Sequence, residues 1–109
     1  MAKQLNFEYK GKDYTLEYTR DSVRQMERSG FVATELATKP MSTLPKLFAG
    51  AFIAHHRFEK PKVIDEMFGL FKNKEALFEK LAEMYSEPME AMMDDEADEG
   101  NAIVWESNF

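Results

Sequence analysis

Cysteine is absent from this 109-residue sequence, and its absence excludes several kinds of chemistry. Without cysteine there is no disulfide bond, no thiolate nucleophile and no thiolate-ligated metal. No apolar run approaches the roughly 20 residues that a membrane-spanning helix needs. The first residues are mostly polar, unlike the apolar stretch of a signal peptide. From these features together we expect a protein of the cytosol.

The sequence is also poor in motifs for catalysis. Its five glycines are dispersed and form neither GxGxxG nor a phosphate-binding loop, and neither GxSxG nor HExxH occurs. The only histidines are the neighbours His55 and His56, which would point about 100° apart on a helix. A metal or acid–base site with Asp65 or Glu66 is the less favoured reading, and we expect one histidine to face the core and the other solvent. We therefore predict no catalytic, metal or cofactor site, and a protein that is not an enzyme.

Charge is unevenly distributed along the chain. All 14 Lys and Arg residues lie before residue 94, together with 14 of the 20 Asp and Glu residues. The net charge of −6 therefore belongs to residues 94–109. A neutral body does not attract nucleic acid or an anionic membrane, and an acidic tail repels both. We expect a folded domain at 1–93 and an acidic, flexible tail at 94–109.

Two stretches near the N-terminus have the alternation of a β-hairpin. Apolar residues take every second position at Leu5, Phe7 and Tyr9, then at Tyr14, Leu16 and Tyr18. The residues between them, 10–13, include a glycine and predict a four-residue loop. Because an isolated hairpin is marginally stable in water, its apolar face is expected to pack on the helices that follow.

Helix start and stop signals predict two helices between residues 19 and 55. Thr19 or Asp21 can cap the first, which Gly30 would end. Residues 31–41 are consistent with either a short strand or a helical turn, ended by Pro40.

Ser42 is predicted to cap the second helix, with Pro45 in its first turn. Its apolar residues recur at helical spacing, so we expect this helix to be central to the core: Leu44, Leu47, Phe48, Ala51, Phe52 and His55.

Two further helices are predicted beyond residue 60. Pro61 would begin a short third helix, and Asn73 would cap a fourth that Pro88 kinks or ends. The predicted fold class is therefore α+β and mostly α, with an N-terminal hairpin packed on about four helices. The glutamates at 75, 79, 83 and 87 recur every four residues and predict a solvated face on the fourth helix.

Methionine is concentrated near the end of the predicted domain. Met84, Met89, Met92 and Met93 lie close together in sequence, beside Tyr85. Methionine is adaptable and is common on surfaces that receive varied apolar partners. These residues predict a groove for a partner protein or a self-association face, or else a helix end packed into its own core.

The tail carries a second candidate interaction site. An acidic run is followed, after Gly100, by an apolar stretch that contains Trp105. This pattern is typical of a short linear motif that adds as a strand to a partner or places Trp105 in a pocket. The alternative is that the segment folds back onto the protein's own hairpin.

The order of these segments resembles the tail assembly chaperones of long-tailed, siphovirus-type bacteriophages. The resemblance rests on the hairpin ending at residues 18–20, the helix with Pro40, Met41 and residues 47–52, the segment with Phe68 and Phe71, residues 77–85, and the Met-rich acidic stretch ending in Trp105 and Glu106. It covers nearly the whole chain, as a pattern rather than a motif.

The resemblance implies a chaperone that binds the tape measure protein, keeps it soluble and helps recruit tail tube subunits. It implies a protein of the host cytosol that is absent from the mature virion. The family has no fixed functional residue, so none is transferred to this chain. Two other functions remain open from the sequence: a small acidic phage inhibitor of a host protein, and a structural connector of the phage head or tail.

Overall fold

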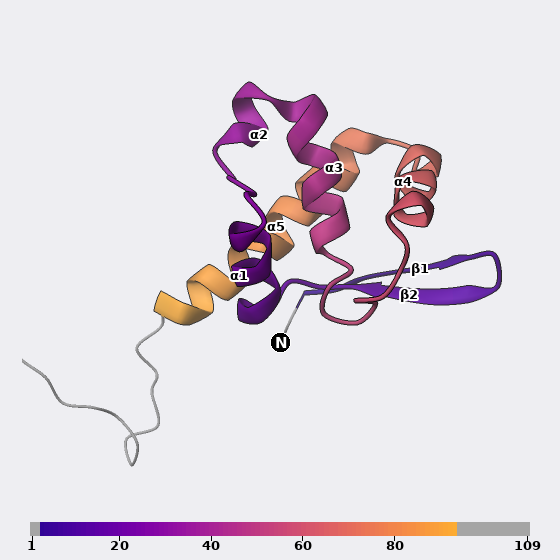
Figure 1. Ribbon diagram of the computed structural model, residues 1–109, viewed down its shortest axis with the longest axis horizontal. Coiled ribbons are helices and arrows are strands. Elements are labelled where there is room, and N and C mark those ends of the chain that lie inside the picture. The colour runs from indigo at the N-terminus through magenta and orange to yellow at the C-terminus, as the bar shows by residue number, and fades with distance from the viewer. Residues whose placement is uncertain (1–2, 94–109) are drawn as a thin grey trace, which may run out of the picture.

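The computed structural model describes residues 3–93, which form one hairpin and five helices (Figure 1). In chain order the elements are β1 (Leu5–Tyr9), β2 (Lys12–Leu16), α1 (Arg20–Arg28), α2 (Glu35–Thr38), α3 (Pro40–Gly50), α4 (Pro61–Leu70) and α5 (Lys74–Met93). The predicted α+β, mostly α fold is confirmed, with one short helix more than expected. The tail at 94–109 lies outside the described residues.

The hairpin turn is shorter than the sequence suggested. β1 and β2 pair antiparallel, with Tyr9 opposite Lys12, so the turn is only Lys10 and Gly11. Both residues have positive φ, 52° and 79°, as a two-residue type I′ turn requires. The predicted four-residue loop is therefore wrong, because this turn matches the twist of the strands and lets Lys12 and Asp13 join β2.

The apolar face of the hairpin packs on the helical part of the protein, as predicted. Tyr14 and Leu16 are buried, and the Phe7 ring stacks on Tyr14 with 5.3 Å between ring centroids. Phe7 also meets Phe52 and Phe71 edge-on, at 6.5 and 5.1 Å. Figure 1 shows the hairpin running beneath α3 and α4, with its turn projecting beyond them.

A capping box begins α1. The Thr19 hydroxyl accepts a hydrogen bond from the Ser22 N–H, and the Ser22 hydroxyl accepts one from the Thr19 N–H. The helix ends at Arg28, and Gly30 follows with a φ of 98°. Of the two predicted caps the structure uses Thr19, and Gly30 lies at the end of the helix as expected.

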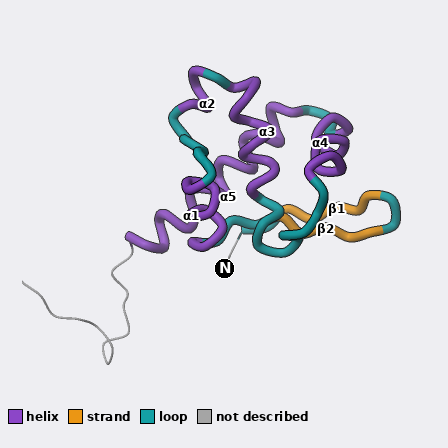
Figure 2. Tube along the Cα trace, viewed as in Figure 1, coloured by secondary structure: helices purple, strands orange, loops and turns teal. Residues whose placement is uncertain are grey.

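Residues 31–41 contain a helical turn rather than a strand, which answers the question left by the sequence. This turn is α2, and Figure 2 shows loops on either side of it. Pro40 does not end the segment but begins α3, because proline needs no hydrogen-bonded N–H in the first helical turn. Ser42 consequently lies inside α3 and is not its cap, contrary to the prediction.

Pro45 lies inside α3 rather than in its first turn. Its missing N–H cannot bond the carbonyl oxygen of Met41, a residue that is 91% exposed. Because that end of the helix faces solvent, water can satisfy the carbonyl group and the helix continues.

α3 is the central helix of the core, as predicted, although it is shorter than expected. It contacts α1, α2, α4 and α5, and Leu47 and Phe48 are completely buried. The regular helix ends at Gly50, and the N–H groups of Ala51 and Phe52 bond to carbonyls three residues back. This tightening turns the chain toward the hairpin, so the predicted continuation to His55 is wrong.

The last two helices begin where the sequence indicated. Pro61 is the first residue of α4, and the Asn73 side chain accepts a hydrogen bond from the Ala76 N–H at 3.2 Å. α5 then runs behind α3 and α1 and continues through Pro88 to Met93 (Figure 1). The prediction that Pro88 could end the helix is not met. Among the described helices, none is long and apolar enough to cross a membrane.

Candidate partner-binding groove

An open groove of about 240 Å³ lies between α1 and α5. Most of its lining is apolar. Its residues come from two segments about 60 positions apart in the sequence: Arg20, Val23, Arg24 and Glu27 on α1, and Tyr85, Pro88, Met89 and Met92 on α5.

The α5 side of the groove is one continuous helical stripe. Tyr85, Pro88, Met89 and Met92 follow the i, i+3, i+4, i+7 spacing that places residues on a single helix face. Nearer the start of α5 the buried residues Leu77 and Leu81 face the core instead. Figure 1 shows the end of α5 extending past α1, where no further element of the described chain covers it.

Large apolar side chains remain accessible in this groove. Met89 is 56% exposed and Met92 is 52% exposed. At the inner end, Tyr85 packs against the rings of Tyr18 and Phe31, at 5.4 and 5.6 Å between centroids. Burial raises the pKa of the Tyr85 hydroxyl, and the negative charge of Glu27 raises it further. The groove thus combines a tyrosine that is held by aromatic packing, Tyr85, with two exposed and flexible methionines, Met89 and Met92.

The α1 side of the groove adds charge. Arg20 and Arg24 lie one helical turn apart, and Glu27 lies close to Tyr85. Arg24 also forms an exposed ion pair with Asp21, at 3.3 Å between Nη1 and Oδ1. Exposed pairs of this kind contribute little to stability, so the Arg24 guanidinium can turn toward an acidic partner at small cost.

The structure separates the residues that the sequence had grouped as a partner site. Tyr85, Met89 and Met92 line the groove together. Met84 is only 5% exposed and belongs to the hydrophobic core, so its side chain does not line the groove. The Met93 side chain and Trp105 lie outside what the structure describes.

Sequence reasoning missed half of the groove. The residues contributed by α1 were not predicted as a site. The available signal was a valine one turn after the helix start, on a helix otherwise rich in arginine; in the structure Val23 is partly buried against the core.

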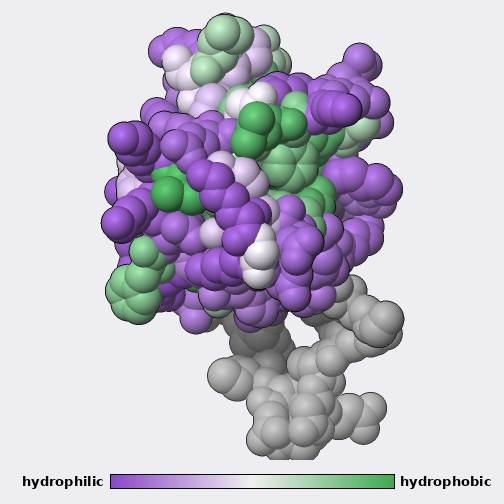
Figure 3. Space-filling model, turned by 90° about the vertical axis from the view of Figure 1, so that its right-hand side faces the viewer, coloured by the Kyte–Doolittle hydropathy of each residue, from purple (hydrophilic) through white to green (hydrophobic). Residues whose placement is uncertain are grey.

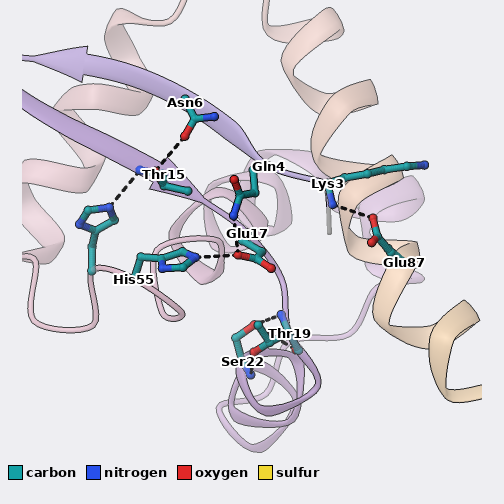
Figure 4. A network of polar contacts seen from close by, with 10 residues as sticks. Lys3, Gln4, Asn6, Thr15, Glu17, Thr19, Ser22, His55 and Glu87 are labelled. Carbon is teal, nitrogen blue, oxygen red and sulfur yellow. Dashed lines mark hydrogen bonds and ion pairs between the residues drawn. The ribbon is translucent and has the colours of Figure 1, made fainter. Parts of the chain in front are cut away.

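Histidine side chains fasten the loop after α3 to β2. The Thr15 N–H donates to His56 Nε2 at 3.0 Å, and the His56 ring packs against Tyr14. The exposed His55 lies 2.6 Å from the Glu17 carboxylate, which also accepts a hydrogen bond from Gln4 (Figure 4). Burial lowers the pKa of His56, with smaller effects from Lys12 and His55. His55 is exposed, and His56 is partly buried against the core rings of Tyr14 and Phe52, so each histidine has structural partners.

A second polar cluster holds the same loop near the hairpin turn. The Tyr14 hydroxyl donates to Glu59 Oε2 at 2.7 Å, and Lys12 Nζ lies 3.3 Å from the same oxygen. This hydrogen bond raises the pKa of Tyr14 to about 12 and lowers that of Glu59. Within residues 3–93 no cluster of three His, Asp or Glu side chains could hold a metal ion.

The glutamate face of α5 is solvated over most of its length, and one part of it holds the N-terminal segment. The Lys3 N–H donates to Glu87 at 2.9 Å (Figure 4). The Lys3 ammonium group also pairs with Glu83 at 3.2 Å. These contacts fix the start of β1 against α5, on the side away from the groove residues.

Figure 3 shows the face of the molecule that carries the hairpin turn and α4, which is mostly hydrophilic with several separate apolar areas. On α4, Leu70 is 65% exposed. This face offers a second exposed apolar surface, and its residues are separate from those of the groove.

The family described as "Domain of unknown function (DUF5055)" matches residues 1–109, and the chain belongs to this family. Searches of curated proteins and of solved structures each found no match.

Proposed function

We propose that this protein is a phage tail assembly chaperone. It binds the tape measure protein, keeps it soluble before assembly and helps recruit tail tube subunits. The proposal joins the sequence's resemblance to that family with an exposed apolar groove suited to a helical partner. On this proposal the protein acts in the bacterial cytosol and is absent from the mature virion.

The observation that carries the proposal is the exposed stripe of α5. Met89 and Met92 are each about half exposed. They line the groove together with Tyr85 on the same helix and Val23 on α1. Laying the apolar face of an amphipathic helix into a groove is a common mode of peptide recognition. Flexible methionine side chains can repack around different sequences, which suits a long client that offers many similar helical stretches.

The distribution of charge supports the same role. A client whose apolar stripes are exposed needs a partner that adds solubility, and the six acidic residues of 94–109 supply a net charge of −6. Arg20 and Arg24 at the rim of the groove can pair with acidic residues on the client helix. Several copies bound along one extended client would cover it, and self-association of the chaperone would assist this.

Co-expression with the tape measure protein tests the proposal. Capture through an N-terminal tag should bring down soluble tape measure protein, which should precipitate when this chain is omitted. The double variant Met89→Asp with Met92→Asp should lose the client, because it places two charges in the apolar groove. The matched control is Leu70→Asp, an equally exposed apolar residue on α4 that should retain the client.

Other results would support other functions. If the tape measure protein stays insoluble in the presence of this chain, the chaperone proposal fails. Capture of a host protein alone would favour the acidic inhibitor. Detection of the chain in purified virions by mass spectrometry would favour a structural connector.

A further inference from the structure

The described chain ends beside the groove. Met93 is the last residue of α5, and Met92 lines the groove. The stripe from Tyr85 to Met92 spans about 10 Å along the helix axis, at 1.5 Å per residue. Any segment that follows α5 therefore starts at one end of a short apolar surface.

The chain beyond Met93 is long enough to return along the groove. Residues 94–101 are mostly acidic and include Gly100, and the apolar segment with Ile103, Val104 and Trp105 follows them. An eight-residue leader reaches at most about 28 Å when extended. A flexible chain of eight residues has an end-to-end distance of about 16 Å. Both values exceed the length of the groove.

Such a short leader also favours binding within one molecule. A flexible linker of this length gives an attached segment a local concentration in the millimolar range. A weak apolar contact that would be negligible between separate molecules is then well populated.

The chemistry of the segment fits that of the groove. Ile103, Val104 and Trp105 are apolar and match the surface formed by the α5 stripe and Val23. Trp105 is the only tryptophan, the residue type that most often anchors an interface. The excess negative charge of the chain lies in residues 94–109. Two of the three charged residues that line the groove are arginines, so the two charges are complementary.

The outer edge of β2, a place where this segment could otherwise add as a strand, is already occupied. The Thr15 N–H bonds to His56, and the Glu17 N–H bonds to the Ala51 carbonyl oxygen at 3.1 Å. A strand added there would have to displace the loop after α3.

We infer that residues 102–109 dock in the α1–α5 groove of their own chain, with Trp105 against the stripe formed by Tyr85, Pro88, Met89 and Met92. The docked segment covers apolar surface that would otherwise face water. The docking does not depend on the proposed chaperone function. If that function holds, the tape measure helix displaces the segment, and the free chaperone is protected from unwanted apolar contacts.

Fluorescence of the single tryptophan tests the inference in the full-length protein without any client. In the native protein, Trp105 should emit at shorter wavelength and be quenched by acrylamide several-fold less than in urea. The double variant Val23→Asp with Met89→Asp should remove this shielding, because both residues line the groove. The control Leu70→Asp should keep it.

A second variant distinguishes loss of docking from misfolding as the cause of any loss of Trp105 shielding. Arg20→Glu with Arg24→Glu leaves the apolar surface intact and should reduce the shielding of Trp105, with unchanged far-ultraviolet circular dichroism. The shielding should not depend on protein concentration.

Three results would overturn the inference. In the first, native Trp105 is as accessible to acrylamide as in urea. In the second, Trp105 stays shielded in the folded Val23→Asp, Met89→Asp variant, which places it elsewhere. In the third, the shielding disappears on dilution, which assigns it to a second copy of the chain. Because no client is present, none of these results depends on the chaperone proposal.

Discussion

His55 and His56 are adjacent in sequence, yet their surroundings differ. His56 accepts a backbone hydrogen bond from Thr15 and packs on Tyr14, whereas His55 is exposed and pairs with Glu17. An imidazole nitrogen that accepts a hydrogen bond must be unprotonated. The loop after α3 is therefore held to β2 by a contact that requires neutral His56.

The stability of the folded protein should depend on pH through His56. The pKa of His56 is lowered from 6.5 in the folded protein, chiefly by burial, so the unfolded chain binds its proton at higher pH. The contribution of His56 is complete above about pH 6.5 and is lost as the pH falls through its folded-state pKa. Urea unfolding between pH 8 and pH 5 should show the free energy of unfolding decreasing in this window.

The control for this prediction is His56→Gln. Glutamine can accept the Thr15 N–H but does not titrate, so the loss of stability specific to His56 should disappear. Hydrogen bonds lower the pKa values of the carboxylates Glu17 and Glu59. Their contributions to stability therefore change only below about pH 4.5, outside the pH range of this measurement. An identical pH dependence in the variant and the native protein would refute the role of His56.

Gly50 provides a second test at the level of single residues. A Cβ atom there would lie 2.8 Å from the Met26 Cγ atom, in a buried part of the core. Gly50→Ala should therefore lower the free energy of unfolding by about 1–3 kcal/mol, as overpacking does. In α4 a Cβ at Gly69 would meet nothing within 4 Å, so Gly69→Ala should be neutral or stabilise the protein by about 0.5–1 kcal/mol. Equal effects of the two substitutions in urea denaturation would contradict this packing.

At the scale of elements, local sequence signals predicted the positions of most helices and strands. The alternation around Phe7 and Tyr14, and the caps at Thr19 and Asn73, act over a few residues and were recognised directly. The errors occur where packing overrides local preference. α3 continues through Pro45, and α5 continues through Pro88, because contacts along each helix outweigh one missing hydrogen bond.

Pro88 leads to a prediction about α5. Replacing it with alanine restores an N–H donor inside the helix, so Pro88→Ala should raise the free energy of unfolding by up to about 3 kcal/mol. Pro61→Ala is the matched control, because Pro61 is the first residue of α4, where proline costs nothing. Urea denaturation should show a gain for Pro88→Ala alone. A loss of stability would mean that the proline shapes the groove and is required for packing.

At the scale of the whole molecule, the groove was only half predictable. Its α5 side appears in the sequence as a run of methionines, but its α1 side depends on contact between helices far apart in the chain. Sequence spacing alone also placed Met84 with Met89 and Met92. Met84 is instead buried in the core.

The separation of charge predicts a change in solubility. Replacing the five acidic residues of 94–99 by Asn and Gln leaves the folded body unchanged but reduces the net charge from −6 to −1. A protein with almost no net charge associates more readily. In polyethylene glycol precipitation at pH 7, the solubility of the variant should therefore be several-fold lower than that of the native protein. Neutralising Glu75, Glu79 and Glu90 on α5, which reduces the net charge to −3, is the control for loss of charge elsewhere. Equal solubility of the native and tail-neutralised proteins would contradict a solubilising role for the tail.

The central claim is that a helical client binds between α1 and α5. Hydrogen–deuterium exchange of this protein, alone and in complex with soluble tape measure fragments, tests it most directly. Exchange should slow on complex formation in Arg20–Arg28 and in residues 85–92, with little change in α4 and the hairpin turn. Protection confined to α4 and the hairpin turn, with α1 and α5 unchanged, would contradict it.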